Sequence, residues 1–427
     1  PFQTALVARF GVAFNLVLVM AVGAYLSTKH INRLPGVLLA TNTQRIATVF
    51  VIGVSTSYLM NDQGLDAIVA VFKMITLLGI VAAIVHLLRN GAKTATLARI
   101  IIASSGAMYL LSLSAFLFGV SPLPGMSVQD TGIFNMSEEN LREFRGRLNG
   151  LGELTEANSV AFLGILPLIL SIGLILRERI RWNNCWIVVI GAILAIGILA
   201  SGSRSTLIAA VAGTSVIFVL HGGSRVRLGS VVALVASGAI LLLIFLPWSG
   251  SSYARLFPGA ELETSSSRSL GYEIDEHRLD MWRAGIALFS DSPAIGVGLG
   301  NYRELAATTW TFSKGGLGPH SAFIQVLSEG GLLATIPFML LIVCVIIVLS
   351  KNQRYESENQ RLWRIVLLAA FVAMLFDAAF QAYHFERFFW VPIAFAAMLE
   401  ARQIGRNQGT QASVQTDEVG AAPGAAD

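Results

Sequence analysis

Residues 331–350 read GLLATIPFMLLIVCVIIVLS, an unbroken apolar stretch that carries no charged side chain. Its length matches the ~20 residues that an α-helix needs to cross the hydrocarbon core of a bilayer. The whole chain of 427 residues has the same character, with 54% hydrophobic and only 13% charged residues. Charged residues make up about 25% of a typical soluble domain. The composition therefore indicates an integral membrane protein.

Ten further segments share the length and low charge of this stretch. They lie at 5–26, 43–60, 65–88, 97–120, 158–176, 185–200, 205–220, 229–247, 365–384 and 388–400. Together they predict an all-α, polytopic membrane protein with about 11–12 transmembrane helices. The sequence begins without Met, so either a further segment precedes Pro1 or one span is assigned wrongly.

Basic residues orient these predicted spans. One set of links is rich in them, and it carries Lys29, Arg33, Arg45, Arg89, Lys93, Arg99, Arg177, Arg179, Arg181, Arg225, Arg227, Lys351, Arg354, Arg361, Arg364, Arg402 and Arg406. The short links on the other side carry only Arg204 and Arg387. Because cytoplasmic loops are enriched in Lys and Arg, we expect the first set to face the cytoplasm and the loops 121–157 and 248–330 to face outward.

The spans and loops divide the chain into four parts. Residues 1–247 are expected to form transmembrane helices with the outer loop 121–157, and residues 248–330 to form a large polar outer loop that contains helices. Residues 331–404 return to transmembrane helices. Residues 405–427 are rich in Gln, Ala, Gly and acidic residues, which predicts a disordered cytoplasmic tail. Since the basic links lack interleaved aromatic residues, we expect membrane lipids, and no nucleic acid, as partners.

The end of the long outer loop holds the histidine that we expect to be catalytic. Residues 315–323 read GGLGPHSAF, so His320 stands between a Gly-rich turn and the start of a predicted helix. A helix N-terminus attracts anions and disfavours a second positive charge on the ring. A neutral imidazole beside an anion site suits a general base. The alternative is a histidine that merely caps a helix at the membrane surface.

An arginine in another outer turn is the second candidate. Arg204 stands in the sequence SGSRS at 201–205, a tight turn that opens the predicted span 205–220 with Ser203 as N-cap. The positive charge of Arg204 would lie beside the N-terminus of this span. That would be a second helix end with partial positive charge, in addition to the one at His320. The alternative is an interfacial arginine whose stem follows apolar surface while its head reaches water.

Arg278 is the third candidate, in a segment whose apolar residues recur at helical spacing. These residues are Leu279, Trp282, Ile286 and Phe289. The pattern predicts an amphipathic helix that rests on the outer surface of the membrane or covers a cavity. Arg283 is expected to belong to a solvated face. Acidic residues are dense nearby, but they show no convincing ligand spacing with histidine, so we expect no metal site.

A set of ordered motifs runs through residues 145–350. In chain order they are Arg147-Leu148-Asn149-Gly150 with Asn158, Ser201-Gly202-Ser203-Arg204, Arg278 four residues before Trp282, Gly296-Val297-Gly298-Leu299-Gly300-Asn301-Tyr302, and Pro319-His320-Ser321 leading to Glu329-Gly330-Gly331. Together they resemble the O-antigen ligase and O-antigen polymerase superfamily of bacterial membrane glycosyltransferases. The chain departs from the family pattern at Ser321, where Asn is usual, although a hydroxyl can still hydrogen-bond.

The resemblance implies a GT-C-like membrane fold and a transfer of O-antigen polysaccharide from undecaprenyl pyrophosphate to a sugar hydroxyl of lipid A core. The active site would face the periplasm from the bacterial inner membrane, and the reaction would be inverting, without metal or other cofactor. Arg204 and Arg278 would bind the pyrophosphate. His320 would be the base, or it would itself hold the pyrophosphate.

Several other residues are weaker candidates. Contacts with the donor or acceptor are expected from Arg147, Lys73, Tyr302, Ser321 and Trp282. The alternatives are interfacial anchoring for the aromatic ones and snorkelling toward an interface for Lys73. Asp377 and Glu386 are candidate partners for the arginines.

Within the superfamily, one dominant outer loop and the lack of a large C-terminal soluble domain in this sequence favour the ligase. The alternatives are an O-antigen or exopolysaccharide polymerase and a protein O-oligosaccharyltransferase, which would use similar chemistry. A flippase or transporter of lipid-linked glycans is the alternative from a different class. Such a protein would be expected to carry more ionisable or helix-breaking residues near the bilayer midplane.

Overall fold

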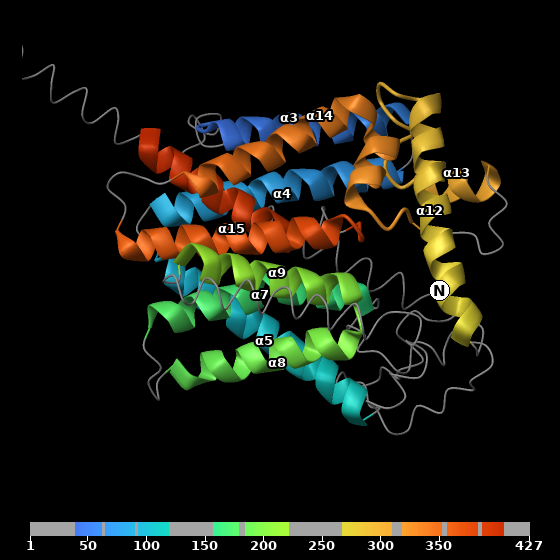
Figure 1. The fold of residues 1–427 in the computed structure, drawn as a ribbon. Helices are drawn as coiled ribbons and strands as arrows, with labels where there is room; N and C mark the ends of the chain where they lie inside the picture. Colours follow the sequence, from blue (N-terminus) through green and yellow to red (C-terminus); the bar gives the residue numbers. More distant parts are fainter. Residues whose placement is uncertain are drawn as a thin grey trace, which may run out of the picture.

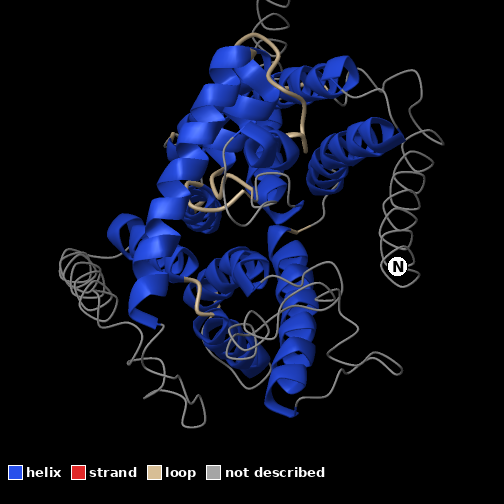
Figure 2. Ribbon diagram, turned by 90° about the vertical axis from the view of Figure 1, so that its right-hand side faces the viewer, coloured by secondary structure: helices blue, strands red, loops and turns tan. Residues whose placement is uncertain are grey.

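The structure is a computed structural model, and it describes residues 39–61, 65–89, 93–118, 157–178, 184–221, 267–309, 318–351, 357–382 and 387–404. These residues form the helices α3 (Asn42–Asn61), α4 (Leu65–Arg89), α5 (Thr94–Phe118), α7 (Ala157–Arg177), α8 (Cys185–Ser201), α9 (Arg204–His221), α12 (Ser267–Asp291), α13 (Tyr302–Thr309), α14 (Ala322–Ser350) and α15 (Glu358–Ala378). A 3₁₀ turn η4 (Arg387–Phe389) leads into a last helix at 390–404. Figure 2 shows helices and loops, without a strand, in the described ranges.

The predicted all-α, multi-pass membrane fold is confirmed. Five helices in the described ranges are long and apolar enough to cross a membrane: Val71–Arg89, Thr94–Ser114, Asn158–Arg177, Arg204–His221 and Ala322–Ser350. Nine of the eleven predicted spans overlap helices, whereas those at 5–26 and 229–247 lie outside the described residues. Large apolar side chains such as Ile52, Ile100 and Leu340 are exposed on the helix surfaces, as expected for helices that face lipid.

Most of these helices run side by side in one bundle, and α12 crosses one end of it (Figure 1). The core joins segments that are far apart in the chain: the Phe50 ring of α3 lies 5.2 Å from Phe338 of α14 and 6.1 Å from Trp390 of the last helix. Helix α15 packs against both α7 and α9, and α12 packs against α13 and α14. The end crossed by α12 is called the α12 end below.

A sharp kink divides α14 into two helical segments. Gly331 has φ 57° and ψ −162°, a conformation that is essentially restricted to glycine. The kink falls where the sequence predicts the polar loop to end and the span 331–350 to begin. It separates the apolar span from a short helix at 322–330, and that short helix starts two residues after His320.

Candidate functional site

His320 occupies a strained position in front of α14. Its φ is 44°, and among the residues that the structure describes it is the single non-glycine residue with positive φ. Ser321 adopts an extended conformation and caps the helix, since its side chain accepts a hydrogen bond from the Ile324 N–H at 3.5 Å. A left-handed non-glycine residue costs about 1–3 kcal/mol, and such residues cluster at functional sites. The strain thus falls on the residue that the sequence singled out.

A buried glutamine fixes the ring of His320. The Nδ1 atom of His320 lies 3.4 Å from Oε1 of Gln381, whose side chain is buried in the turn after α15. An amide oxygen can only accept a hydrogen bond. A neutral imidazole that donates from Nδ1 to this oxygen carries its lone pair on Nε2. This is the tautomer in which Nε2 can take up a proton.

One helical turn before Gln381, Asp377 is completely buried between α15 and the start of α9. The hydroxyl of Thr206 lies 3.1 Å from both Asp377 oxygens, and the side chain of Ser205 also hydrogen-bonds this carboxylate. Ser203 in turn lies 2.9 Å from the Thr206 hydroxyl. A carboxylate at a helix N-terminus is favoured by the helix dipole. This polar cluster ties the first turn of α9, which begins at the exposed Arg204, to the end of α15.

Helix α12 contributes two side chains to the same end of the bundle. The positive charge of Arg278 stabilises the charged form of the Asp377 carboxylate. One turn further on, Nε1 of Trp282 donates a hydrogen bond of 3.1 Å to the carbonyl of Pro319, the residue before His320. The half-buried Trp282 therefore anchors α12 on the turn that carries His320.

The face of α12 that packs on the protein leaves out two residues of its apolar sequence pattern. Met281, Ala284 and Leu288 are buried, whereas Leu279 and Ile286 are exposed. An amphipathic helix that rests on the membrane surface, with the exposed Leu279 and Ile286 toward the lipid, stays a prediction. The interior neighbours of α12 are α13 and α14, and it is their position that selects the buried side. Arg283 is exposed and pairs with Asp280 at 3.0 Å, in agreement with a solvated face.

The glycine-rich segment before α13 binds the kink of α14 through backbone hydrogen bonds. The N–H groups of Val297 and Gly298 donate to the carbonyls of Ser328 and Glu329, each at 3.0 Å. Beyond the kink, the N–H of Leu332 donates to Pro293 at 2.8 Å.

The two backbones meet so closely at Gly296 and Gly331 that a Cβ atom on Gly331 would lie 2.4 Å from the Gly296 nitrogen. We call the loop at 292–301 the kink loop. Its glycines permit contact between two backbones, so no phosphate needs to be invoked to explain them.

A buried carboxylate completes this junction. Glu329 is 1% exposed, and it accepts hydrogen bonds from the Gln325 side chain at 2.9 Å and from the Tyr302 N–H at 3.4 Å. The backbone of Gly300 also hydrogen-bonds it. Ser57 of α3 donates to the Glu329 carbonyl at 2.6 Å. The kink, the kink loop and α3 are thus joined at one residue.

Tyr302 lies in the interior. Its ring is completely buried, and its hydroxyl donates to the Met281 carbonyl of α12 at 2.5 Å. Burial, together with the negative charge of Glu329, raises the pKa of this phenol, so it stays a donor. The ring therefore supports α12 from within, and a contact of Tyr302 with a sugar stays a prediction.

The remaining predicted residues are dispersed. Ser321 is buried as the cap of α14, and Lys73 is exposed on α4, which packs on α3. Arg147 and Glu386 lie outside the described residues.

The structure adds Gln381, Ser205 and Thr206 to the candidate site, and none of these was singled out from the sequence. The available signal was weak: Gln381 and Asp377 are polar residues one helical turn apart inside a predicted apolar span, a pattern that marks functional positions in membrane helices.

Comparison with known protein families gives one match. Residues 189–339 match the family described as O-Antigen ligase. The matched part contains Arg204, Arg278 and His320, whereas Asp377 and Gln381 follow it. No curated protein matches the chain. The family match thus confirms that this membrane protein resembles the O-antigen ligase and O-antigen polymerase superfamily.

Proposed function

We propose that the chain is an O-antigen ligase, which transfers O-antigen polysaccharide from undecaprenyl pyrophosphate to a sugar hydroxyl of lipid A core. One observation carries the proposal: a strained His320 that contacts Gln381 shares the α12 end with Arg278, the buried Asp377 and the N-terminus of α9. The reaction needs a base beside an anion-binding site, and this end supplies groups for both tasks.

The pyrophosphate of the donor is proposed to bind between Arg204 and Arg278. The two guanidinium groups and the single carboxylate of Asp377 leave a net positive charge, and the N-terminus of α9 adds backbone N–H groups that favour anions. Charge-assisted hydrogen bonds from arginine to phosphate are about twice as strong as neutral ones. They would strengthen further as negative charge develops on the leaving group.

His320 is proposed to act as the general base through Nε2. The acceptor hydroxyl oxygen attacks the anomeric carbon and forms the new glycosidic bond, while the bond from that carbon to the pyrophosphate oxygen breaks. Undecaprenyl pyrophosphate leaves with the electron pair, and the hydroxyl proton passes to Nε2 of His320. Because the attack and the departure occur on opposite faces of the sugar, the anomeric configuration inverts.

The site is proposed to face the periplasm from the inner membrane. The reason is the asymmetry of the short links, since those at the end opposite α12 are rich in basic residues and those at the α12 end carry only Arg204 and Arg387. Loop 248–330 would then form one wall of the site, and the spans on either side would form its base. Trp282 and Arg147 stay candidates for contacts with the sugars.

Purified protein tests the proposed chemistry. The full chain in detergent or lipid, given undecaprenyl-pyrophosphate-linked glycan and lipid A core, should form the glycan–core product without added nucleotide. A lack of product, with movement of the donor across vesicles instead, would overturn the glycosyltransferase assignment and indicate transport.

A deletion strain separates the ligase from a polymerase. Gels of its lipopolysaccharide should show core without O-antigen, together with accumulated lipid-linked polymer. Core that bears a single repeat unit would overturn the ligase assignment, because ligation would still be occurring while polymerisation had stopped.

A further inference from the structure

The opposite end of the bundle, where α4 and α7 end and α5 and α15 begin, contains a cavity of about 270 Å³. Its lining includes the cationic side chains of Lys93, Arg177 and Arg402. None of the described residues that line it is acidic. Thr94, Asn359 and the buried Trp363 contribute a hydroxyl, an amide and an apolar wall. Such a set of donors suits an anion.

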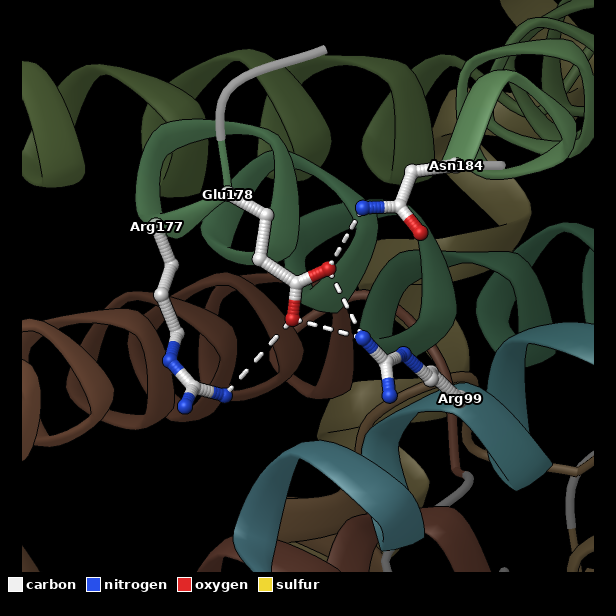
Figure 3. A network of polar contacts seen from close by, with 4 residues as sticks. All are labelled: Arg99, Arg177, Glu178 and Asn184. Atoms are coloured by element: carbon white, nitrogen blue, oxygen red, sulfur yellow. Dashed lines mark hydrogen bonds and ion pairs between the residues drawn. The ribbon is translucent and has the colours of Figure 1, made fainter. Parts of the chain in front are cut away.

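The positive charge of this cavity is only partly balanced by its neighbours. Glu178 lies beside Arg177, but its carboxylate is held chiefly by Arg99, whose Nη2 lies 2.7 Å and 2.8 Å from the two oxygens. Asn184 donates a further bond of 2.9 Å. Arg177 approaches the same carboxylate only to 3.8 Å (Figure 3). One carboxylate is thus shared by two guanidinium groups, and the cavity keeps an excess of positive charge.

The cavity is also held in place by the helix ends. Arg402 of the last helix donates from Nη2 to the Leu88 carbonyl in the final turn of α4 at 3.1 Å. This contact fixes its guanidinium at the rim where Lys93 precedes α5. The candidate membrane spans Val71–Arg89 and Asn158–Arg177 end beside the cavity and Thr94–Ser114 begins there, so a bilayer crossed by these spans would place the cavity at the level of the lipid head groups.

We propose that this cavity binds the phosphate of an anionic membrane lipid through Lys93, Arg177 and Arg402. Basic pockets between transmembrane helices bind anionic head groups. The volume supports a head group, because pockets for whole small-molecule ligands span about 300–1,000 Å³. The site is separate from the α12 end, and it would bind its lipid whether or not the chain transfers glycan.

Titration of the full-length protein in neutral detergent with short-chain phosphatidylglycerol tests this site. A variant with Lys93→Gln, Arg177→Gln and Arg402→Gln should bind on the order of a hundredfold more weakly, and Lys93→Gln alone about fivefold more weakly. The matched control is Arg45→Gln with Lys351→Gln and Arg361→Gln, which removes three charges from the same end without altering the cavity. Its affinity should stay within about threefold of the wild type.

Two results would overturn the proposal. Equal losses of lipid affinity in the cavity variant and its control would show a general effect of charge. Loss of the Arg402 contact is a risk to the fold of the triple variant. Lys93 is exposed, so the Lys93→Gln variant tests the cavity without that risk. Displacement of the lipid by equimolar inorganic phosphate would identify free phosphate, rather than lipid, as the ligand. Weak binding of short-chain phosphatidylcholine, together with insensitivity to phosphate, is the expected result.

Discussion

The two ends of the helix bundle use charged side chains in different ways. At the α12 end, Arg278 acts on the completely buried Asp377, in a polar cluster whose neighbour Gln381 fixes His320. At the opposite end, Arg99 pairs with Glu178 where both side chains are partly exposed. Exposed ion pairs contribute about 0–1 kcal/mol, whereas loss of one partner from a buried polar contact costs about 1–3 kcal/mol. The difference predicts that matched changes at the two ends have unequal effects.

The largest difference is expected between two histidines. His320→Ala should lower the rate of glycan transfer by about 10²–10⁴-fold, because it removes the proposed general base. His221→Ala, in the last turn of α9 at the opposite end, should leave the rate nearly unchanged. Transfer by the two purified variants provides the measurement. Similar rates for both variants would remove the catalytic distinction between the two ends.

A second contrast concerns backbone packing. Gly331→Ala should destabilise the protein by about 3 kcal/mol or more, since alanine is strained at this φ and its Cβ would meet the kink loop. Gly79→Ala is the control, because a Cβ there meets nothing within 4 Å inside α4. It should be neutral or stabilising by up to about 1 kcal/mol. Thermal unfolding in detergent compares the stability of the two variants. Equal stability would show that the kink does not depend on glycine.

Two carboxylates give the smallest of these contrasts. Glu329→Gln should destabilise the protein by about 1–3 kcal/mol, because the amide offers one oxygen in place of two and brings donors toward buried N–H groups. Glu178→Gln changes a partly exposed ion pair and should cost at most about 1 kcal/mol. Denaturant unfolding of both variants gives the difference. A larger loss from Glu178→Gln would reverse the proposed contrast.

Much of the architecture could be predicted from the sequence, because membrane spans are set by local composition. The segments 43–60, 158–176 and 185–200 correspond closely to α3, α7 and α8. The turn at Arg204 and the helix start after His320 could be predicted as well, the first from Ser203 as an N-cap residue and the second from the Gly-rich turn that precedes the helix.

Contacts between distant segments could not be predicted in this way. The kink loop pairs with Ser328 and Glu329 through backbone groups, which leave no trace in side-chain pattern beyond the glycines. The buried face of α12 depends on where α13 and α14 lie, so periodicity alone does not show that Met281, Ala284 and Leu288 are its buried residues. The contact between His320 and Gln381 joins residues 61 positions apart and depends on how α14 and α15 pack.

The affinity for undecaprenyl pyrophosphate tests most directly whether the α12 end is the anion site. Arg278 and Arg283 lie on the same helix, but only Arg278 acts on Asp377, whereas Arg283 is exposed beside Asp280. Arg278→Ala should weaken binding of this lipid by the purified protein by about tenfold or more, as expected for a lost hydrogen bond to a charged group. Arg283→Ala should bind like the wild type. Equal affinities for the two variants would contradict the account.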